Sequence, residues 1–328
     1  MKLIIQIPCY NEEATLGKTL GELPRAISDI DTVEWLVIDD GSTDDTVGTA
    51  RKHGVDHIVC LPRHQGLARA FMVGLESCLK AGADIIVNTD ADNQYCADDI
   101  PKLIQPILQG EAEMVIGARP IESIEHFSGV KKVLQRAGSW VVRIASRSCV
   151  ADAPSGFRAI SREAAVHLNV FSEYTYTLET VIQAGQKNMA VASVPIRVNK
   201  ELRPSRLVKS IPSYVYRSVS TIVRIFMTYK PMRFFFTPAI VLFTMGFVLG
   251  LRFLYYYAMG QGGGKVQSLI LVAILILMGF QLGLFGLIAD LISVNRKLME
   301  EVQWRLRKRE FGGGQRTEKD DTPKEMSD

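Results

Sequence analysis

Two acidic residues separated by one position, and followed by an amide, are the strongest sign of chemistry in this sequence. Asp90, Asp92 and Gln94 stand in the stretch Asp-Ala-Asp-Asn-Gln. Carboxylate and amide oxygens are the hard ligands that Mg²⁺ or Mn²⁺ prefers when it also binds phosphates. A metal ion bridging a diphosphate would stabilise the charge that develops on a departing nucleotide. The pattern therefore predicts a Mg²⁺ or Mn²⁺ site and a reaction that displaces a nucleoside diphosphate.

Two further polar stretches follow earlier apolar runs in the same way. One runs from Pro8 to Glu13 (Pro-Cys-Tyr-Asn-Glu-Glu) and the other from Asp39 to Ser42 (Asp-Asp-Gly-Ser). Each alone could be a helix cap, because Asp and Asn commonly begin helices. Three such stretches, each directly after an apolar run, instead favour a ligand site at the carboxyl edge of a parallel sheet.

The elements that must position these residues alternate between strand-like and helix-like patterns. Up to about residue 205, short apolar runs alternate with amphipathic stretches, which is typical of an α/β fold with a parallel sheet. Strands are predicted at Leu3–Ile7, Trp35–Asp39, His57–Leu61, Asp84–Thr89 and Met114–Gly117. Helices are predicted at 14–27, 44–53, 66–81 and 98–109.

The composition excludes some classes of function. The 328 residues carry 38 basic and 35 acidic side chains, for a formal charge of +3, so the chain lacks the basic footprint of a nucleic-acid-binding protein. Five cysteines are scattered without a C-x-x-C pair, which argues against a structural zinc site or a disulfide framework. We expect no nucleic-acid partner and a reducing environment.

Two long apolar stretches predict membrane-spanning helices. They cover Phe234–Tyr257 and Leu269–Ile288, and each is long enough to cross the hydrocarbon core of a bilayer. A buried helical hairpin of a soluble protein is the alternative, although buried helices rarely stay so long and uncharged. Arg252 stands near the end of the first stretch beside three tyrosines, where a long side chain can reach the interface.

The charges that flank these stretches predict their orientation. The flanking basic residues are Arg217, Arg224, Lys230, Arg233, Arg296, Lys297, Arg305, Arg307, Lys308 and Arg309. The loop between the stretches holds only Lys265. Because basic flanks stay on the cytoplasmic side, we expect an integral membrane protein with two spans, whose two termini and α/β domain are cytoplasmic.

Four segments follow from these patterns. They are an α/β domain (1–207), an interfacial amphipathic helix (208–232), a transmembrane hairpin (233–292) and a basic helix with a disordered tail (293–328). A helix docked on the soluble domain is the alternative for the second segment. The motifs Gly246-x-x-x-Gly250 and Gly279-x-x-x-Gly283 would let helices approach closely, which permits a homo-oligomer such as a tetramer.

The chain as a whole resembles a family-2 glycosyltransferase of the GT-A fold. Within that family it is similar to the polyprenyl-phosphate glycosyltransferases, the branch of dolichyl-phosphate mannose synthase and the bacterial polyisoprenyl-phosphate glucosyltransferases. The motifs cover roughly residues 3–207, and the two spans match the membrane-anchored members. Beyond the three polar stretches, the resemblance rests on residues 64–70, 117–119, 155–158 and 203–207. His64 stands where many members have Asn.

The resemblance implies an activity and a role for each matching residue. The activity is inverting transfer of a sugar from a UDP-sugar or GDP-mannose to undecaprenyl or dolichyl phosphate, for the assembly of cell-envelope glycans or glycoconjugates. The implied contacts are Pro8, Tyr10 and Glu12 with the nucleoside, Asp39 and Asp40 with base or ribose, and Asp90, Asp92 and Gln94 with metal and diphosphate. Asp92 would thereby be catalytic.

A lipid phosphate acceptor would need cations more than a base, because it is already an anion near neutral pH. Planar arginine donors suit phosphate. The candidate acceptor residues are Arg119, Arg136, Lys200, Arg203 and Arg206, each of which could also be a solvated surface charge. Arg119 and Arg136 match family positions and are taken as catalytic. Glu179 is either an orienting or basic group of the site or a helix-surface glutamate.

Two other functions compete with this one. A processive polysaccharide synthase shares the nucleotide and metal motifs, but such enzymes carry Gln-x-x-Arg-Trp before several spans. Here only Gln303-Trp304-Arg305 follows the last span. A non-catalytic membrane scaffold is the second alternative, and the intact acidic motif argues against it.

Overall fold

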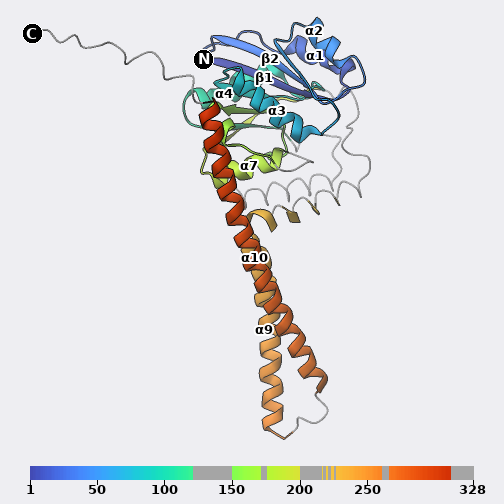
Figure 1. Cartoon of the computed structure of the whole chain (residues 1–328), viewed down its shortest axis with the longest axis vertical. Coiled ribbons are helices and arrows are strands. Elements are labelled where there is room, and N and C mark those ends of the chain that lie inside the picture. Colours follow the sequence, from blue (N-terminus) through green and yellow to red (C-terminus); the bar gives the residue numbers. More distant parts are fainter. Residues whose placement is uncertain are drawn as a thin grey trace, which may run out of the picture. The chain divides into compact units, whose positions relative to one another are not determined.

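The computed structural model describes residues 1–120, 150–170, 176–199, 227–260 and 266–311, with five positions between 216 and 224. The chain divides into two compact units, one of Met1–Val215 with Val302–Asp328 and the other of Tyr216–Glu301. The first unit holds a sheet with its helices, and the second holds two long helices (Figure 1).

A seven-stranded, mainly parallel sheet forms the centre of the first unit. Its strands are β1 (Lys2–Cys9), β2 (Thr32–Asp39), β3 (His57–Cys60), β4 (Ile85–Asn88), β5 (Met114–Ala118), β6 (Arg158–Ser161) and β7 (Val191–Pro195). They lie in the order β3-β2-β1-β4-β6-β5-β7, and β6 runs antiparallel to both of its neighbours. The predicted α/β class and the five N-terminal strands are confirmed.

Helices bury the central strands. The helices of the N-terminal part are α1 (Glu13–Glu22), α2 (Thr46–Lys52), α3 (Leu67–Lys80) and α4 (Ile100–Leu108), the last preceded by a short 3₁₀ turn, η1 (Ala97–Asp99). Helix α3 packs against β1 and β2, and α4 packs against β5 and β6. All four residues of β4 are buried, as expected of a parallel strand covered on both faces.

The C-terminal part of the first unit contains elements that the sequence did not predict. Strands β6 and β7 belong to it, with α6 (Arg162–His167) and α7 (Thr177–Gln186) between them. Ser161 is the N-cap of α6: its Oγ accepts a hydrogen bond from the Ala164 backbone N–H at 3.2 Å. Strand β6 thus leads directly from the buried sheet into a capped helix.

The last turns of α10 (Val266–Phe311) pack within the first unit. Arg307 donates from Nη2 to the Glu76 carboxylate at 2.8 Å and from Nη1 to the Leu168 carbonyl at 2.6 Å. The Trp304 ring stacks on His167 with centroids 4.8 Å apart. The predicted second span and the predicted basic helix are therefore one continuous helix, and the tail after Phe311 lies outside the described residues.

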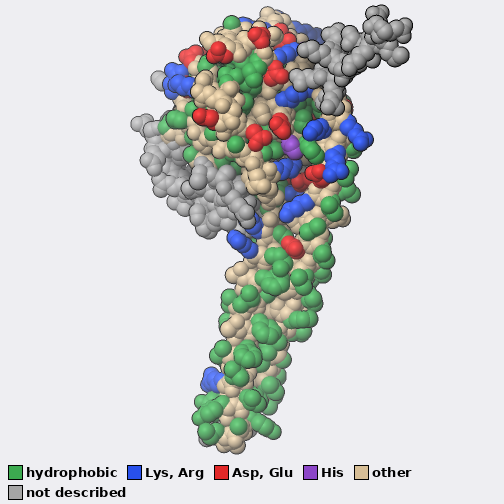
Figure 2. Space-filling model, turned by 90° about the vertical axis from the view of Figure 1, so that its left-hand side faces the viewer, with side chains coloured by type: hydrophobic (Ala, Val, Ile, Leu, Met, Phe, Trp, Pro, Cys, Tyr) green, Lys and Arg blue, Asp and Glu red, His purple; other side chains and the backbone are tan. Residues whose placement is uncertain are grey.

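The second unit consists of α9 (Pro231–Ala258) and most of α10, both long and apolar enough to cross a membrane, with mean hydropathies of 2.1 and 2.5 in their most apolar windows. Hydrophobic side chains cover the visible face of this helix pair (Figure 2). A Cβ on Gly279 would lie 2.9 Å from the Phe243 backbone nitrogen, so glycine lets the two backbones approach closely here. The Arg252 guanidinium lies 5.8 Å from the centre of the Tyr256 ring. Most of the predicted interfacial helix lies outside the described residues.

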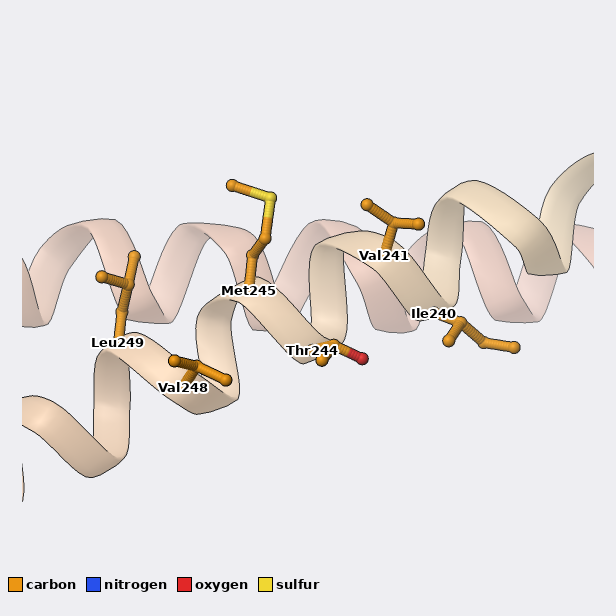
Figure 3. Close-up of a pocket in the computed structure, with 6 residues that line it drawn as sticks. All are labelled: Ile240, Val241, Thr244, Met245, Val248 and Leu249. Carbon is orange, nitrogen blue, oxygen red and sulfur yellow. The ribbon is translucent and has the colours of Figure 1, made fainter.

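An apolar groove runs along α9. Its lining is Ile240, Val241, Thr244, Met245, Val248 and Leu249, all from that one helix (Figure 3). These side chains include no ionisable group that could bind a phosphate or a metal ion. The chemistry must therefore be sought at the sheet.

Candidate active site

The carboxyl ends of β1, β2 and β4 bring the three predicted polar stretches to one edge of the sheet. Cys9 at the end of β1 pairs with Asp39 at the end of β2, and Gln6 of β1 pairs with Asn88 of β4. Thr19 of α1 donates from Oγ1 to the Ala91 carbonyl at 2.9 Å, which joins the first helix to the loop after β4. The sheet topology thus places the acidic loop beside the two others, as predicted.

Asp40 holds a loop in place. Its Oδ1 accepts the Gln65 N–H and its Oδ2 the Gly66 N–H, both at 2.8 Å. The His64 Nδ1 lies 2.8 Å from the same Oδ2, and the His64 ring stacks on Tyr10 with centroids 3.9 Å apart. Asp40 is only 2% exposed, whereas Tyr10 and His64 are open to solvent. Asp40 therefore helps to hold the His64 ring where it stacks on Tyr10, and both rings are exposed.

The other predicted nucleoside residues lie deeper in the same loops. Pro8 is a buried member of β1. Glu12 is 8% exposed, and its Oε2 accepts a hydrogen bond from the Thr15 hydroxyl at 2.7 Å. Both oxygens of Asp39, which is 5% exposed, lie within 3.3 Å of the Ser42 backbone nitrogen. Among these candidates Tyr10 offers the most open surface, and the predicted roles of all of them stay predictions.

The surroundings of the acidic pair that follows β4, Asp90 and Asp92, differ from those of Asp40. Asp90 and Asp92 are both partly exposed. Enclosure by the surrounding protein, and next the charge of Asp92, raise the pKa of Asp90 to about 7. The Asp92 Oδ1 accepts the Gln94 backbone N–H at 3.1 Å, which curls the loop around the pair. Two carboxylates that oppose each other's charge form a natural place for a cation.

A buried ion pair lies beside these carboxylates. Arg119, which follows β5, donates from Nε to Asp152 Oδ2 at 2.7 Å and from Nη2 to Asp152 Oδ1 at 3.1 Å. Asp152 is fully buried, and the Arg119 side chain is 11% exposed. The nearby charge of Arg119 partly offsets the rise in the Asp90 pKa. Asp152 fixes the plane of the guanidinium, a role that no spacing in the sequence indicated.

The loop from Asp152 to Phe157 is held by a second buried arginine. Arg158 is fully buried and donates to the carbonyls of Ser155 and Ala153 at 2.8 and 2.6 Å. It also donates to the Thr180 hydroxyl of α7 at 2.5 Å. The hydrogen bonds from Arg158 thereby hold this loop in place.

Gly156 lets this loop come close to the acidic pair. A Cβ at Gly156 would lie 3.0 Å from both carboxylate oxygens of Asp90 and from the Tyr176 hydroxyl. The Gly156 carbonyl accepts a hydrogen bond from Asn88 Nδ2 at 2.8 Å, and its N–H donates to the Tyr95 hydroxyl at 3.1 Å. Strand β4, the loop after it and the Gly156 loop thus form one buried polar network.

The residues of this edge fit a divalent cation that arrives with a diphosphate. Within the described ranges no three His, Cys, Asp or Glu side chains gather closely enough to hold a metal ion alone. Two carboxylates completed by phosphate oxygens are a common set for Mg²⁺, and Gln94 stands partly exposed in the same loop. Two buried polar atoms of the neighbouring loops, Asn93 Nδ2 and Ser155 Oγ, lack a hydrogen-bond partner among the described residues.

The remaining candidates are less well placed or lie outside the described residues. Glu179 is on the first turn of α7, where its Oε1 is 3.5 Å from Gln183 Nε2, and its catalytic role stays a prediction. The candidates outside the described residues are Arg136, Lys200, Arg203 and Arg206.

The chain is similar to known glycosyltransferases. The family model for glycosyl transferase family 2 matches residues 4–165. The UDP-N-acetylglucosamine--dolichyl-phosphate N-acetylglucosaminyltransferase of Methanococcus voltae is 30% identical over 216 residues, which cover 58% of this chain and 83% of that protein. The undecaprenyl-phosphate mannosyltransferase of Micrococcus luteus is 28% identical over 218 residues, which cover 63% of this chain and 88% of that protein.

A solved structure shares the fold. Glucosyl-3-phosphoglycerate synthase from Mycobacterium tuberculosis, in complex with Mn²⁺, UDP-glucose and phosphoglyceric acid, superposes with a TM-score of 0.55 at 24% identity. The match covers 69% of this chain and 78% of that chain. At this identity the likeness shows the shared architecture, the GT-A fold expected from the sequence.

Proposed function

Because the chain belongs to glycosyl transferase family 2, we propose that it transfers a sugar from a nucleotide-sugar, either a UDP-sugar or GDP-mannose, to the phosphate of a polyprenyl lipid. The observation that carries the proposal is the acidic pair Asp90 and Asp92 at the end of β4, beside Arg119, which is held by the fully buried Asp152. The acceptor is supported by the relatives named for dolichyl phosphate and undecaprenyl phosphate.

The proposed reaction is a single displacement. An oxygen of the lipid phosphate forms a bond to the anomeric carbon of the sugar, while the bond from that carbon to the nucleoside diphosphate breaks. The diphosphate leaves with the bonding electron pair, and the acceptor needs no deprotonation because it is already ionised. Inversion at the sugar carbon follows from the family resemblance.

Each part of the site has a distinct task in this reaction. A bound Mg²⁺ or Mn²⁺ would stabilise the charge on the leaving diphosphate, and Asp90 and Asp92, with Gln94, would hold it. Arg119, its plane fixed by Asp152, would orient the acceptor phosphate. The exposed Tyr10 and His64 rings would support the nucleoside. Arg136, Lys200, Arg203 and Arg206 remain acceptor residues proposed from the sequence.

The two long apolar helices fit a lipid acceptor. A polyprenyl chain resides in a bilayer, and an enzyme with two candidate spans works at its surface. We propose that the protein is an integral membrane protein with its termini and sheet unit on the cytoplasmic side, as the flanking basic residues indicate. A tetramer remains a prediction from the glycine motifs.

The polysaccharide-synthase alternative gains no support from the residues nearest to its motif. Gln303 and Trp304, the nearest match to the motif of such enzymes, make packing contacts in the first unit: Gln303 accepts a hydrogen bond from Asn169, and Trp304 stacks on His167. These contacts explain both residues without a saccharide acceptor.

The test uses the purified full-length protein in liposomes with and without undecaprenyl phosphate. Radiolabelled UDP-glucose, UDP-N-acetylglucosamine and GDP-mannose are supplied in turn, and label is extracted into organic solvent. We expect label in the lipid phase with at least one donor, only when the lipid phosphate is present, and loss of transfer in EDTA that Mn²⁺ restores. Transfer that does not depend on the lipid phosphate would contradict the acceptor, and no transfer from any donor would favour the scaffold.

A further inference from the structure

A short antiparallel pairing joins residues 197–199, here called the tether, to the loop that carries the acidic pair. Val198 forms a β-bridge with Tyr95. The Asn199 backbone N–H donates to the Gln94 carbonyl at 2.8 Å, and the Cys96 N–H donates to the Arg197 carbonyl at 3.4 Å. The tether thus runs alongside the residues that directly follow Asp92.

The side chain of Asn199 adds a second link to the same loop. Its Nδ2 lies 3.1 Å from the Asn93 carbonyl and 3.3 Å from the Tyr95 carbonyl, so one amide group bridges the two carbonyls on either side of Gln94. The same Nδ2 is 3.3 Å from the Glu22 carboxylate of α1. A single side chain therefore fixes the backbone direction at the predicted ligand Gln94.

The turn that Asn199 holds contains a left-handed residue. Asn93 has a φ of +58°, a conformation that residues with a side chain adopt less readily than glycine. Such a turn persists when surrounding contacts over-determine it. The two hydrogen bonds from Asn199 supply such contacts on both sides of the turn.

The other end of the tether is anchored independently. The Arg197 backbone N–H donates to Asp99 Oδ2 at 2.7 Å, and its Nη2 lies 2.9 Å from Asp99 Oδ1. Asp99 is fully buried at the start of α4. Because the tether is fixed at this end, Asn199 approaches the loop from a defined position.

We propose that Asn199 is a positioning residue that sets the geometry of the loop Asp90–Gln94 for the cation and the diphosphate. The inference rests on the proposed function, in which this loop binds both. Groups that orient metal ligands from the outside typically change metal affinity by about 10- to 100-fold when removed. Asn199 acts in this way through the carbonyls of Asn93 and Tyr95, on either side of Gln94.

The experiment compares Asn199→Asp with two control variants in the full-length protein in detergent. Asn199→Asp keeps the shape but replaces the donor by an acceptor. Glu22→Gln alters only the outer partner of the amide. Asn169→Asp makes the same chemical change at an asparagine whose Nδ2 donates to Gln303. Mn²⁺ binding is measured by electron paramagnetic resonance with UDP or GDP present, and hydrogen exchange of amides 94–96 is measured without metal.

We expect Asn199→Asp to weaken Mn²⁺ binding about 10-fold and to speed exchange at Cys96, while both controls stay within about twofold of wild type. Wild-type Mn²⁺ affinity in Asn199→Asp overturns the proposal, and so does an equal loss in either control. Should Asn199→Asp not fold, Asn199→Ser is judged by the same two outcomes.

The binding and exchange measurements are independent of the acceptor. If no sugar reaches a lipid phosphate, the proposed function fails. The role of Asn199 is still decided by Mn²⁺ affinity and by amide exchange in the metal-free protein.

Discussion

The ends of β2 and β4, which flank β1 on either side, use an aspartate in opposite ways. The carboxylate of Asp40 is almost fully buried. It accepts hydrogen bonds from two backbone N–H groups and lies next to His64. Asp90 faces another carboxylate, and the pKa of Asp90 rises. The hydrogen bonds of the loop satisfy the carboxylate of Asp40, whereas the surroundings of Asp90 disfavour its charged form in the protein alone.

Replacing Asp92 by alanine would break this comparison most directly. We expect transfer activity to fall by about 10³-fold or more, because a metal ion supplies several kcal/mol of transition-state stabilisation. The initial rate of label transfer to lipid phosphate measures the effect. Asp98→Ala is the matched control, because the Asp98 side chain is 80% exposed and lies outside the loop Asp90–Gln94. Activity within tenfold of wild type in Asp92→Ala would refute the metal assignment.

Replacing Asp152 by asparagine tests how much the Arg119–Asp152 ion pair, which lies beside Asp90, stabilises the protein. Breaking a buried ion pair leaves Arg119 uncompensated and should destabilise the protein by about 3 kcal/mol, seen as a fall in Tm of roughly 6–12 °C. Asp56→Asn, at the exposed pair with Arg25, should cost less than about 1 kcal/mol. Equal shifts in the two variants would show that burial of the Arg119 pair adds nothing.

Adding a methyl group at Gly156 tests how closely the loop must approach Asp90. Alanine would place its Cβ 3.0 Å from both Asp90 oxygens, so the carboxylate must shift. We expect a loss of turnover that is smaller than the roughly 100-fold cost of a misplacement of about 1 Å, because the carboxylate has to move by only a few tenths of an ångström. Gly21→Ala is the control, because a Cβ there would meet nothing within 4 Å. Turnover equal to the control would mean that the position of Asp90 is not critical.

The smallest effect is expected in a comparison of Asp40→Asn with Asp90→Asn, both in metal-free protein at pH 8. Asp40→Asn should lower Tm by about 2–4 °C, since it weakens hydrogen bonds to a charged group. Asp90→Asn should raise Tm, because the folded state holds the charged form of Asp90 at a disadvantage.

The pH dependence supplies the control for that pair. A carboxyl group whose folded pKa is raised from 3.8 to about 7 destabilises the fold fully above pH 7 and not at all below about pH 4. The gain from Asp90→Asn should therefore shrink at pH 5. A gain of the same size at both pH values would mean that charge is not its cause.

Much of the fold could be predicted because the five N-terminal strands are apolar runs with turn residues between them. Strand β6 escaped prediction because it begins with Arg158, a charged residue that is fully buried in a four-residue strand. The second span and the basic helix after it were predicted as separate segments, because the apolar pattern ends at Ile288, but they form the single helix α10.

The sequence indicated a candidate site where residue type and spacing carry the chemistry, as at Asp90, Asp92 and Gln94, whose roles stay predictions. Asp152 and Asn199 were missed because each acts through a partner distant in sequence: Arg119 for the first, and the carbonyls of Asn93 and Tyr95 for the second. The resemblance implied that Asp40 contacts base or ribose, and the structure shows that its carboxylate accepts hydrogen bonds from the backbone of Gln65 and Gly66.

The order of strands also determines when the sheet can be completed during synthesis. A nascent chain that ends at Ala118 already contains β5, yet β5 pairs with β6 and β7, which are made about 40 and 75 residues later. Until Arg158 emerges from the ribosome, the outer edge of β4 stays open, and an open strand edge is prone to unwanted pairing. The whole sheet is present once Pro195 has been made, before the first residue of α9. The sheet can therefore form before the first apolar helix is made, whereas the first unit is complete only once the end of α10 packs onto it.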